Sequence, residues 1–329
     1  MAATRLARLA FATAALVLGL SVHSAPSRAQ PVQVALGDTV SVETLAMVIA
    51  LERAKAKGVD YKLTSFAKED LAIQAVIGGQ ADLGIATPYA VMDKTKAPLR
   101  GLFQFTHLVF FAVADKSIKD WKALNGQPMT FHARGSGTEA IGNILAARNG
   151  IAFGQRNYIA GSENRVVAMM NGQVKSTILD LANKNLLLQK GGDKFHVLPG
   201  LANPASDEIL FATTAWIGKN GAKVDTIVEE FYRLWTEMAK NPQVIEAERE
   251  KRGLLKDQPK EVLANVTKFY TQGVKEGVFS KTGGGPDAVK ADFDFYVEAG
   301  HLKGPASAIK VEDFWTLGPL DKARKKVGS

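Results

Sequence analysis

Cysteine is missing from this 329-residue chain, and histidine is scarce. The lack of cysteine excludes a disulfide-stapled scaffold, a cysteine nucleophile, a thiolate zinc site and an iron–sulfur cluster. The five histidines are scattered, and no two of them stand four residues apart, the spacing that places two imidazoles on one face of a helix. The sequence therefore predicts no metal site.

A hydrophobic run long enough to cross a bilayer is also lacking. The N-terminal run 9–22 has 14 residues, whereas a membrane-spanning helix needs about 20. Arg5 and Arg8 precede this run, and small residues follow it up to Ala29, which is the pattern of a secretory signal peptide. We predict that residues 1–29 are a signal peptide and that the mature protein is soluble and periplasmic. The alternative is a retained N-terminal anchor.

Charge of either sign is modest in the expected mature chain. The full sequence has a net charge of +8, to which the first 29 residues contribute three arginines and no acidic residue. Four of the other positive charges lie together in the segment 322–326, and such a run usually forms a solvated face. No basic helix carries interleaved aromatic residues, so we expect no nucleic-acid partner.

What the chain does have is an alternation of short apolar strands and helices. After residue 31 the pattern predicts strand, helix, strand, helix and strand. This order is typical of a parallel sheet with helices packed on its faces. The expected elements are strands 32–36, 61–67 and 81–86 and helices 44–57 and 71–77.

The same order recurs further along the chain. Segment 77–86 aligns with segment 170–179, and both contain a Gly-Gln pair at the same place before an apolar strand. The chain therefore has two similar α/β halves. The second half contains the expected strands 128–133, 157–160 and 174–179 and the expected helices 138–148 and 164–170.

Two long β-like runs, 103–114 and 208–217, flank the second half and indicate that it is inserted into the first. The predicted fold class is α/β with two lobes, each a mostly parallel sheet flanked by helices, joined by two crossing strands. Helices are expected again after the second crossing. The expected lobes are 30–118 with 208–329 for lobe one and 119–207 for lobe two, and the expected late helices are 224–240 and 261–273.

Several short motifs in a fixed order carry a resemblance to a known family. They are GQADLGIA at 79–86, LNGQ at 124–127, GSGT at 135–138, NGQV at 171–174, DFYVEAG at 294–300 and VEDFWTLGPL at 311–320. With them the chain resembles periplasmic solute-binding proteins of ABC importers, in the nitrate, sulfonate, taurine and thiamine-precursor group. The resemblance implies a type II periplasmic binding fold, a small-molecule ligand between the lobes, and an inner-membrane permease and its ATPase as partners. A monomer is expected.

Ligands of open parallel sheets bind beyond the carboxyl ends of the strands, and three loops in each lobe have that position. The candidate ligand-binding residues in lobe one are Gly37, Asp38, Thr39, Ser65, Phe66, Thr87, Pro88 and Tyr89, and those in lobe two are Arg134, Gly135, Ser136, Gly137, Thr138, Ser162, Glu163 and Asp180.

The Gly135 loop, residues 134–138, is the most specific of these signals. A strand followed by Gly-Ser-Gly-Thr at a helix start offers backbone N–H groups and a positive helix end, which suit a carboxylate or sulfonate. The alternative is a capped turn without ligand contact. The loop also fits G-x-G-x-x-A, but a dinucleotide site needs an acid about 20 residues further on, and Glu163 lies 28 residues from Gly135. We therefore expect no cofactor.

Other candidates have two interpretations each. Asp38 and Asp180 either pair with a ligand amine or act as turn and cap carboxylates. Tyr89 either stacks on a flat ligand or packs in the core. Arg134 and Arg165 could bind an anion, and solvent or an ion pair is the alternative for Arg165. His132 is expected to be a satisfied core histidine.

Three classes of function remain open at this stage. The preferred one is capture of a small polar organic solute, such as a sulfonate, a carboxylate or a pyrimidine-like molecule, for an importer. An exported protein that feeds a sensor is the alternative. An enzyme is disfavoured because no G-x-S-x-G element or cysteine nucleophile is present.

Overall fold

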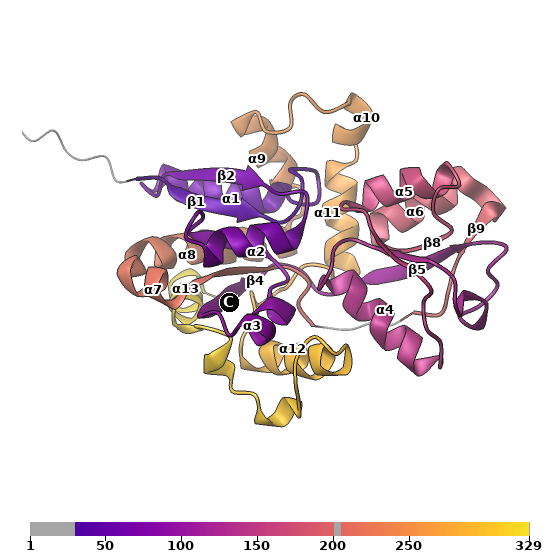
Figure 1. The fold of residues 1–329 in the computed structure, drawn as a ribbon. Coiled ribbons are helices and arrows are strands. Elements are labelled where there is room, and N and C mark those ends of the chain that lie inside the picture. Colours follow the sequence, from indigo (N-terminus) through magenta and orange to yellow (C-terminus); the bar gives the residue numbers. More distant parts are fainter. Residues whose placement is uncertain (1–29, 201–204, 329) are drawn as a thin grey trace, which may run out of the picture. The chain divides into compact units, whose positions relative to one another are not determined.

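Two five-stranded sheets organise the chain (Figure 1). The computed structural model describes residues 30–200 and 205–328, and the elements below belong to one unit that begins at Pro31. The predicted signal peptide, residues 1–29, lies outside the described residues. The first sheet has the order β2-β1-β3-β10-β4, with β1 at Val32–Leu36, β2 at Tyr61–Ser65, β3 at Leu83–Ala86, β4 at Leu99–Gln104 and β10 at Ile209–Thr213.

The second sheet repeats this arrangement. Its order is β7-β6-β8-β5-β9, with β5 at Phe110–Asp115, β6 at Met129–Phe131, β7 at Arg156–Tyr158, β8 at Ser176–Asp180 and β9 at Phe195–Val197. In each sheet four strands run in the same direction and one runs antiparallel between two of them: β10 between β3 and β4, and β5 between β8 and β9. The predicted two-lobed α/β fold class is confirmed.

Helices cover both faces of these sheets. They are α1 Leu45–Ala56, α2 Glu69–Ile77, α3 Tyr89–Thr95, α4 Gly137–Arg148, α5 Ser162–Met170, α6 Leu181–Gly191, α7 Thr214–Lys219, α8 Gly221–Lys240, α9 Val244–Arg252, α10 Lys260–Leu263, α11 Val266–Lys275, α12 Pro286–Glu298 and α13 Gly318–Val327. Short 3₁₀ turns lie at Lys122–Leu124, Gly192–Lys194, Ala306–Ala308 and Val311–Asp313. No helix in the described part of the chain is long and apolar enough to span a membrane.

Burial on both faces of the first sheet explains its apolar strands. Val34 and Leu36 of β1 belong to the core that contains α1, α8 and α13, whereas Ala35 between them belongs to the core under α2. Side chains on a strand alternate between faces, so one strand contributes to two cores. Helix α8, expected at 224–240, presents an apolar stripe that includes Phe231 and Trp235, and both side chains are buried.

The crossings between the sheets differ from the prediction in detail. The run 103–114 is two strands, because β4 pairs in the first sheet and β5 pairs antiparallel with β8 in the second. The first crossing is therefore the segment 105–109, ahead of the expected boundary at 118/119, and we propose that lobe two begins with β5. The run 208–217 is also not a single strand, because it contains the strand β10 followed by the start of helix α7. Strand β10 ends at Thr213, whose hydroxyl accepts the Trp216 N–H and caps α7.

Smaller differences concern helices. The expected helix 261–273 is two helices, α10 and α11, separated at residues 264–265. The pattern also missed α3, α6, α9, α12 and α13 as well as β9. Strand β2 ends at Ser65 and β3 begins at Leu83, so both are shorter than expected.

Candidate ligand-binding site

A cavity lies where the carboxyl ends of the parallel strands of both sheets meet the crossing segments. It has two adjacent parts, whose linings share Glu43, Phe110, Asp207 and Glu208. We call the part with a volume of about 60 Å³ the acidic cavity; its other lining residues are Asp38, Thr44, Glu69, His132, Ser136, Gly137, Thr138, Ser162 and Arg165. This volume holds several water molecules or a small ligand group.

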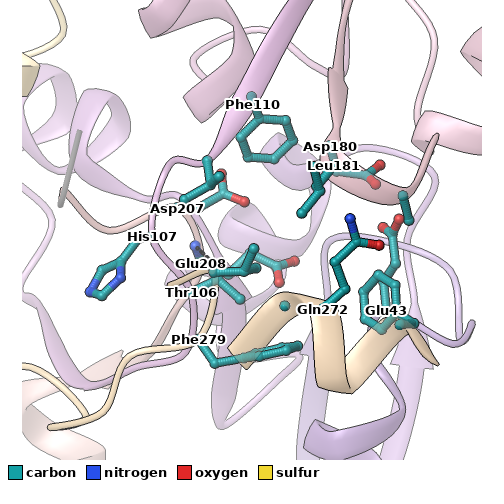
Figure 2. A pocket seen from close by; sticks show the side chains of 15 residues that line it. Glu43, Thr106, His107, Phe110, Asp180, Leu181, Asp207, Glu208, Gln272 and Phe279 are labelled. Atoms are coloured by element: carbon teal, nitrogen blue, oxygen red, sulfur yellow. Dashed lines mark hydrogen bonds between the residues drawn. The ribbon is translucent and has the colours of Figure 1, made fainter. Parts of the chain in front are cut away.

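The second part, which we call the aromatic cavity, has a volume of about 70 Å³ (Figure 2). Its other lining residues are Thr106, His107, Val109, Asp180, Leu181, Ala182, Phe269, Gln272, Gly273, Val278 and Phe279. Figure 2 shows the Gln272 side chain pointing from α11 toward Asp180 and Glu43. The cavity therefore joins a carboxylate-rich end to a wall of phenylalanine rings.

Burial dominates the electrostatics of the acidic cavity. It raises the pKa of Asp207 to about 7, with Asp38 and Asp180 adding to the effect and Arg165 opposing it. It also raises the pKa of Glu69 well above its ordinary value, and the nearby carboxylates of Asp207 and Glu208 raise it further. Carboxyl groups this close to one another cannot all ionise without strong repulsion.

A carboxyl pair bridges the lobes at the boundary between the two cavities. Burial raises the pKa of Glu43 well above its ordinary value, and the Asp180 carboxylate, to which Glu43 hydrogen-bonds, raises it further. Asn183 on α6 donates from Nδ2 to Glu43 Oε1 at 2.9 Å and to Asp180 Oδ2 at 2.8 Å. Asp180 also accepts the Asn183 N–H and so caps α6, as its alternative interpretation predicted.

Arg165 and His132 differ from their expected environments. Arg165 is only 1% exposed, and its guanidinium donates to Ile178 O, Ile159 O and Ser162 Oγ. It is thus the buried cation of the site, neither in solvent nor in a surface ion pair. His132 follows the end of β6 and lines the acidic cavity, where burial and the Arg165 charge lower its pKa to about 3 and keep it neutral.

The Gly135 loop is largely satisfied from within the chain. Gly135 N–H donates to Glu139 Oε2 at 2.6 Å, and Ser136 Oγ accepts the Glu139 N–H at 3.4 Å, so both bonds cap the start of α4. The Ser136 hydroxyl donates to Ala133 O, and Thr138 Oγ1 accepts the His132 N–H. These bonds correspond to the capped-turn interpretation.

A second carboxylate lies against the same helix end. A Cβ built on Gly137 would come within 2.5 Å of Asp207 Oδ1, so glycine is what allows this approach. The positive end of α4 therefore faces the acidic side chains of Glu139 and Asp207.

The predicted site residues fall into three groups. Asp38, Ser136, Gly137, Thr138, Ser162 and Asp180 line one of the two cavities. Thr39 and Glu163 line a wider pocket next to them, in which Glu43 and Ala182 also take part. The others lie outside these linings: Gly37, Ser65, Phe66, Thr87, Pro88, Tyr89, Arg134 and Gly135.

Among this last group, Tyr89 has the core-packing position that was the alternative to ligand stacking. It is fully buried, donates to Asp292 and accepts a hydrogen bond from Trp315 Nε1 at 2.7 Å. Thr87 is buried and Arg134 is exposed beside the Tyr158 ring. We therefore remove Tyr89, Thr87 and Arg134 from the candidate ligand contacts.

Sequence reasoning missed several residues that line the cavity, above all Glu43, Glu69, Phe110, Asp207 and Glu208. Asp207 and Glu208 precede β10, and Phe110 begins β5; both strands run antiparallel to their neighbours. Their amino ends therefore lie at the carboxyl edge of the parallel strands. Asp207, Glu208 and Phe110 do not follow a predicted strand, so the rule that ligands bind beyond strand ends does not identify them. The position of two acidic residues just before a crossing strand is the signal that identifies Asp207 and Glu208.

Comparison with known proteins supports the fold. A family model described as NMT1/THI5 like matches residues 52–245, which is more than half of the chain. The chain belongs to this family. The predicted resemblance is thereby confirmed at the level of the family, and no curated protein matches this NMT1/THI5-like chain.

Solved structures share the architecture at low sequence identity. A protein of Bordetella bronchiseptica RB50 is 19% identical with a TM-score of 0.74, covering 92% of this chain and 99% of that one. The periplasmic nitrate-binding protein NrtA from Synechocystis PCC 6803 is 14% identical with a TM-score of 0.67, covering 91% and 90%. The alkanesulfonate-binding protein SsuA from Xanthomonas axonopodis pv. citri, bound to MOPS, is 15% identical with a TM-score of 0.60, covering 83% and 94%.

Proposed function

We propose that this NMT1/THI5-like protein is the periplasmic solute-binding component of an ABC importer and that it holds a small polar organic solute between its lobes. The observation that carries the proposal is the composition of the cavity wall. Asp38 and Glu69 come from the first sheet's side, Ser136 and Arg165 from the second, and Asp207 from a crossing segment. A ligand there contacts both lobes and a crossing segment at once.

This placement couples binding to domain movement. A ligand that touches both lobes only when they are close together favours the closed arrangement by its contacts in that state. The crossing segments, which include Thr106 and Asp207, are where the backbone can bend. An importer reads this closure as the signal that the carrier is loaded, so we propose an inner-membrane permease and its ATPase as partners of a monomeric carrier.

The similar structures named above bind nitrate and an alkanesulfonate according to their descriptions, and they support a carrier over an enzyme. The acidic cavity also lacks the arrangement of an activated nucleophile. Among the described residues, the hydroxyls that line it from lobe two are those of Ser136, Thr138 and Ser162, which are engaged in capping or in holding Arg165. The neighbouring His132 accepts the Gly161 N–H at Nδ1. We propose a binding role without catalysis.

Two measurements test the proposal. The first is a thermal-shift screen of purified, refolded protein against solutes of both charges, since a ligand at 100 times its Kd adds about 2.7 kcal/mol to the free energy of unfolding. The variant Ala182→Trp, which fills the aromatic cavity, should abolish the shift, and Ala147→Trp on the exposed face of α4 should retain it.

The second measurement is uptake of the retained solute by cells with and without the gene. Loss of uptake on deletion supports the importer. Undiminished uptake together with loss of a transcriptional or chemotactic response would support the sensor alternative. Turnover of the solute by the purified protein, or a thermal shift unaffected by Ala182→Trp, would overturn the proposed role.

A further inference from the structure

The charge of the cavity is the feature that the proposed function does not explain. Six carboxyl groups line the two cavities, those of Asp38, Glu43, Glu69, Asp180, Asp207 and Glu208. They face one guanidinium, that of Arg165, and the two lining histidines have lowered pKa values and are neutral at pH 7. The site therefore has many more acidic groups than cations, and burial without a counter-ion keeps several of them protonated in the ligand-free protein.

Arg165 does not reverse this balance for an incoming anion. Its Nε and both terminal nitrogens already donate to Ile178 O, Ile159 O and Ser162 Oγ, all within its own lobe. The positive end of α4, where an anion would otherwise bind, faces the carboxylates of Glu139 and Asp207. An anionic ligand would have to displace these internal acids or lie beside them.

Glu69 gives independent evidence for a missing hydrogen-bond partner. Its side chain is 6% exposed and lines the acidic cavity, yet its Oε2 has no hydrogen-bond partner. The Thr87 hydroxyl lies 3.4 Å from Glu69 Oε1 but 2.6 Å from Asp207 O, and its single proton is directed to the nearer oxygen. A buried carboxyl oxygen without a partner is destabilising, and a ligand with N–H donors would satisfy it; a cationic ligand would also favour the ionised form of this acid.

The wall next to the acids determines what the rest of the ligand is like. Phe110 lines both cavities, and Phe269, Phe279 and Leu181 continue the apolar surface (Figure 2). Phenylalanine faces attract cations within about 6 Å and pack against flat or aliphatic groups. No group of three or more acidic or histidine side chains in the described residues is arranged to hold a metal ion.

We infer that the solute is an organic cation, whose protonated nitrogen donates to Glu69, Asp38 and Asp207 and whose apolar part lies against Phe110 and Phe279. This inference rests on the proposed function and narrows its substrate class. A cation placed there contacts acidic groups of lobe one and of the crossing segment, and its apolar part contacts Phe110 of β5, so it favours the closed arrangement. The anionic solutes suggested by the Gly135 loop are replaced by this class.

The test compares solutes that differ in charge. Phenethylamine and 3-phenylpropionate share an aromatic ring on a two-carbon chain and carry opposite charges; agmatine, ethanesulfonate, nitrate and Mg²⁺ complete the set. Calorimetry at pH 8 should detect binding of at least one amine and none of the three anions. Glu69→Gln should weaken amine binding roughly 10- to 150-fold, the range for loss of a hydrogen bond to a charged group.

Glu312→Gln provides the matched control, because Glu312 is exposed on the turn Val311–Asp313. This variant should bind the amine with the same affinity as the unchanged protein. Asp38→Asn is a second cavity variant in case Glu69→Gln does not fold, and it should weaken amine binding too. Binding of an anion in preference to the amines, or of Mg²⁺ alone, would overturn the inference and leave the carrier function standing. A panel in which nothing binds, with uptake unchanged by deletion, would contradict both.

Discussion

Neutralising Asp207 should make the ligand-free protein more stable at neutral pH. The Asp207 carboxyl is enclosed by Asp38, Asp180 and Arg165, and burial raises its pKa from an ordinary value of 3.8 to about 7. The folded state therefore holds the proton more tightly than the unfolded state does. Asp207→Asn removes the ionisable group while keeping its size, and the backbone bonds of Asp207 to Thr87 and Thr106 are unaffected.

The magnitude follows from the linkage between pKa and stability. A tenfold change in acid dissociation corresponds to about 1.4 kcal/mol, so an acid whose pKa is about 7 when folded destabilises the protein by on the order of 4 kcal/mol once it is ionised in both states. The penalty is absent only well below pH 3.8, where the group is protonated in both states. It grows as the pH rises toward 7 and is complete above that. The stability of the variant should thus be close to that of the unchanged protein at pH 4 and exceed it at pH 8.

Urea unfolding of refolded, ligand-free protein between pH 4 and pH 8, followed by tryptophan fluorescence, measures this difference. Asp294→Asn serves as the control, because Asp294 is exposed on α12, and its effect should be small at every pH. A difference between the Asp207 variant and the unchanged protein that does not vary with pH would refute the reasoning. So would a variant that is less stable at pH 8.

Further predictions concern affinity, the Gly135 loop and processing. Amine binding should strengthen from pH 5 to pH 8 in calorimetry, because Asp207 must lose its proton to hold a cation; constant affinity would contradict this. Thr138→Ala removes hydrogen bonds to the Ser136 hydroxyl and the His132 backbone N–H. Scanning calorimetry should therefore show a Tm a few degrees lower for the ligand-free protein, while the Kd for the amine stays unchanged. Thr138→Ser keeps the hydroxyl and should restore the Tm. Gly137→Ala pushes the Asp207 carboxylate aside and should weaken amine binding; an unchanged Kd would separate Asp207 from the ligand. Intact mass of exported protein should show a chain that begins after residue 29, and retention of those residues would disprove the signal peptide.

Local patterns in the sequence were sufficient for the architecture. Apolar strands such as Val32–Leu36 and the stripe on Gly221–Lys240 follow from periodicity, because burial on one or both faces constrains residue types locally. The recurrence of strand and helix in two halves likewise indicated two α/β lobes. Strand ends and the break between α10 and α11 did not follow, because hydrogen-bonded pairing and packing set them.

The charge of the site was decided by tertiary structure alone. A Gly-Ser-Gly-Thr loop indicates an anion site only if its N–H and hydroxyl donors are free to bind a ligand. Folding brings Asp207, which lies 70 positions beyond Gly137 in the sequence, against the start of α4. Glu69 stands just ahead of the helix expected at 71–77, and in the fold it becomes a buried acid with an unpartnered oxygen next to Gly37 and Thr87. Burial and the mutual repulsion of carboxylates depend on distances between remote segments. No window of the sequence contains those distances, and so the sequence predicted the position of the cavity and not its charge.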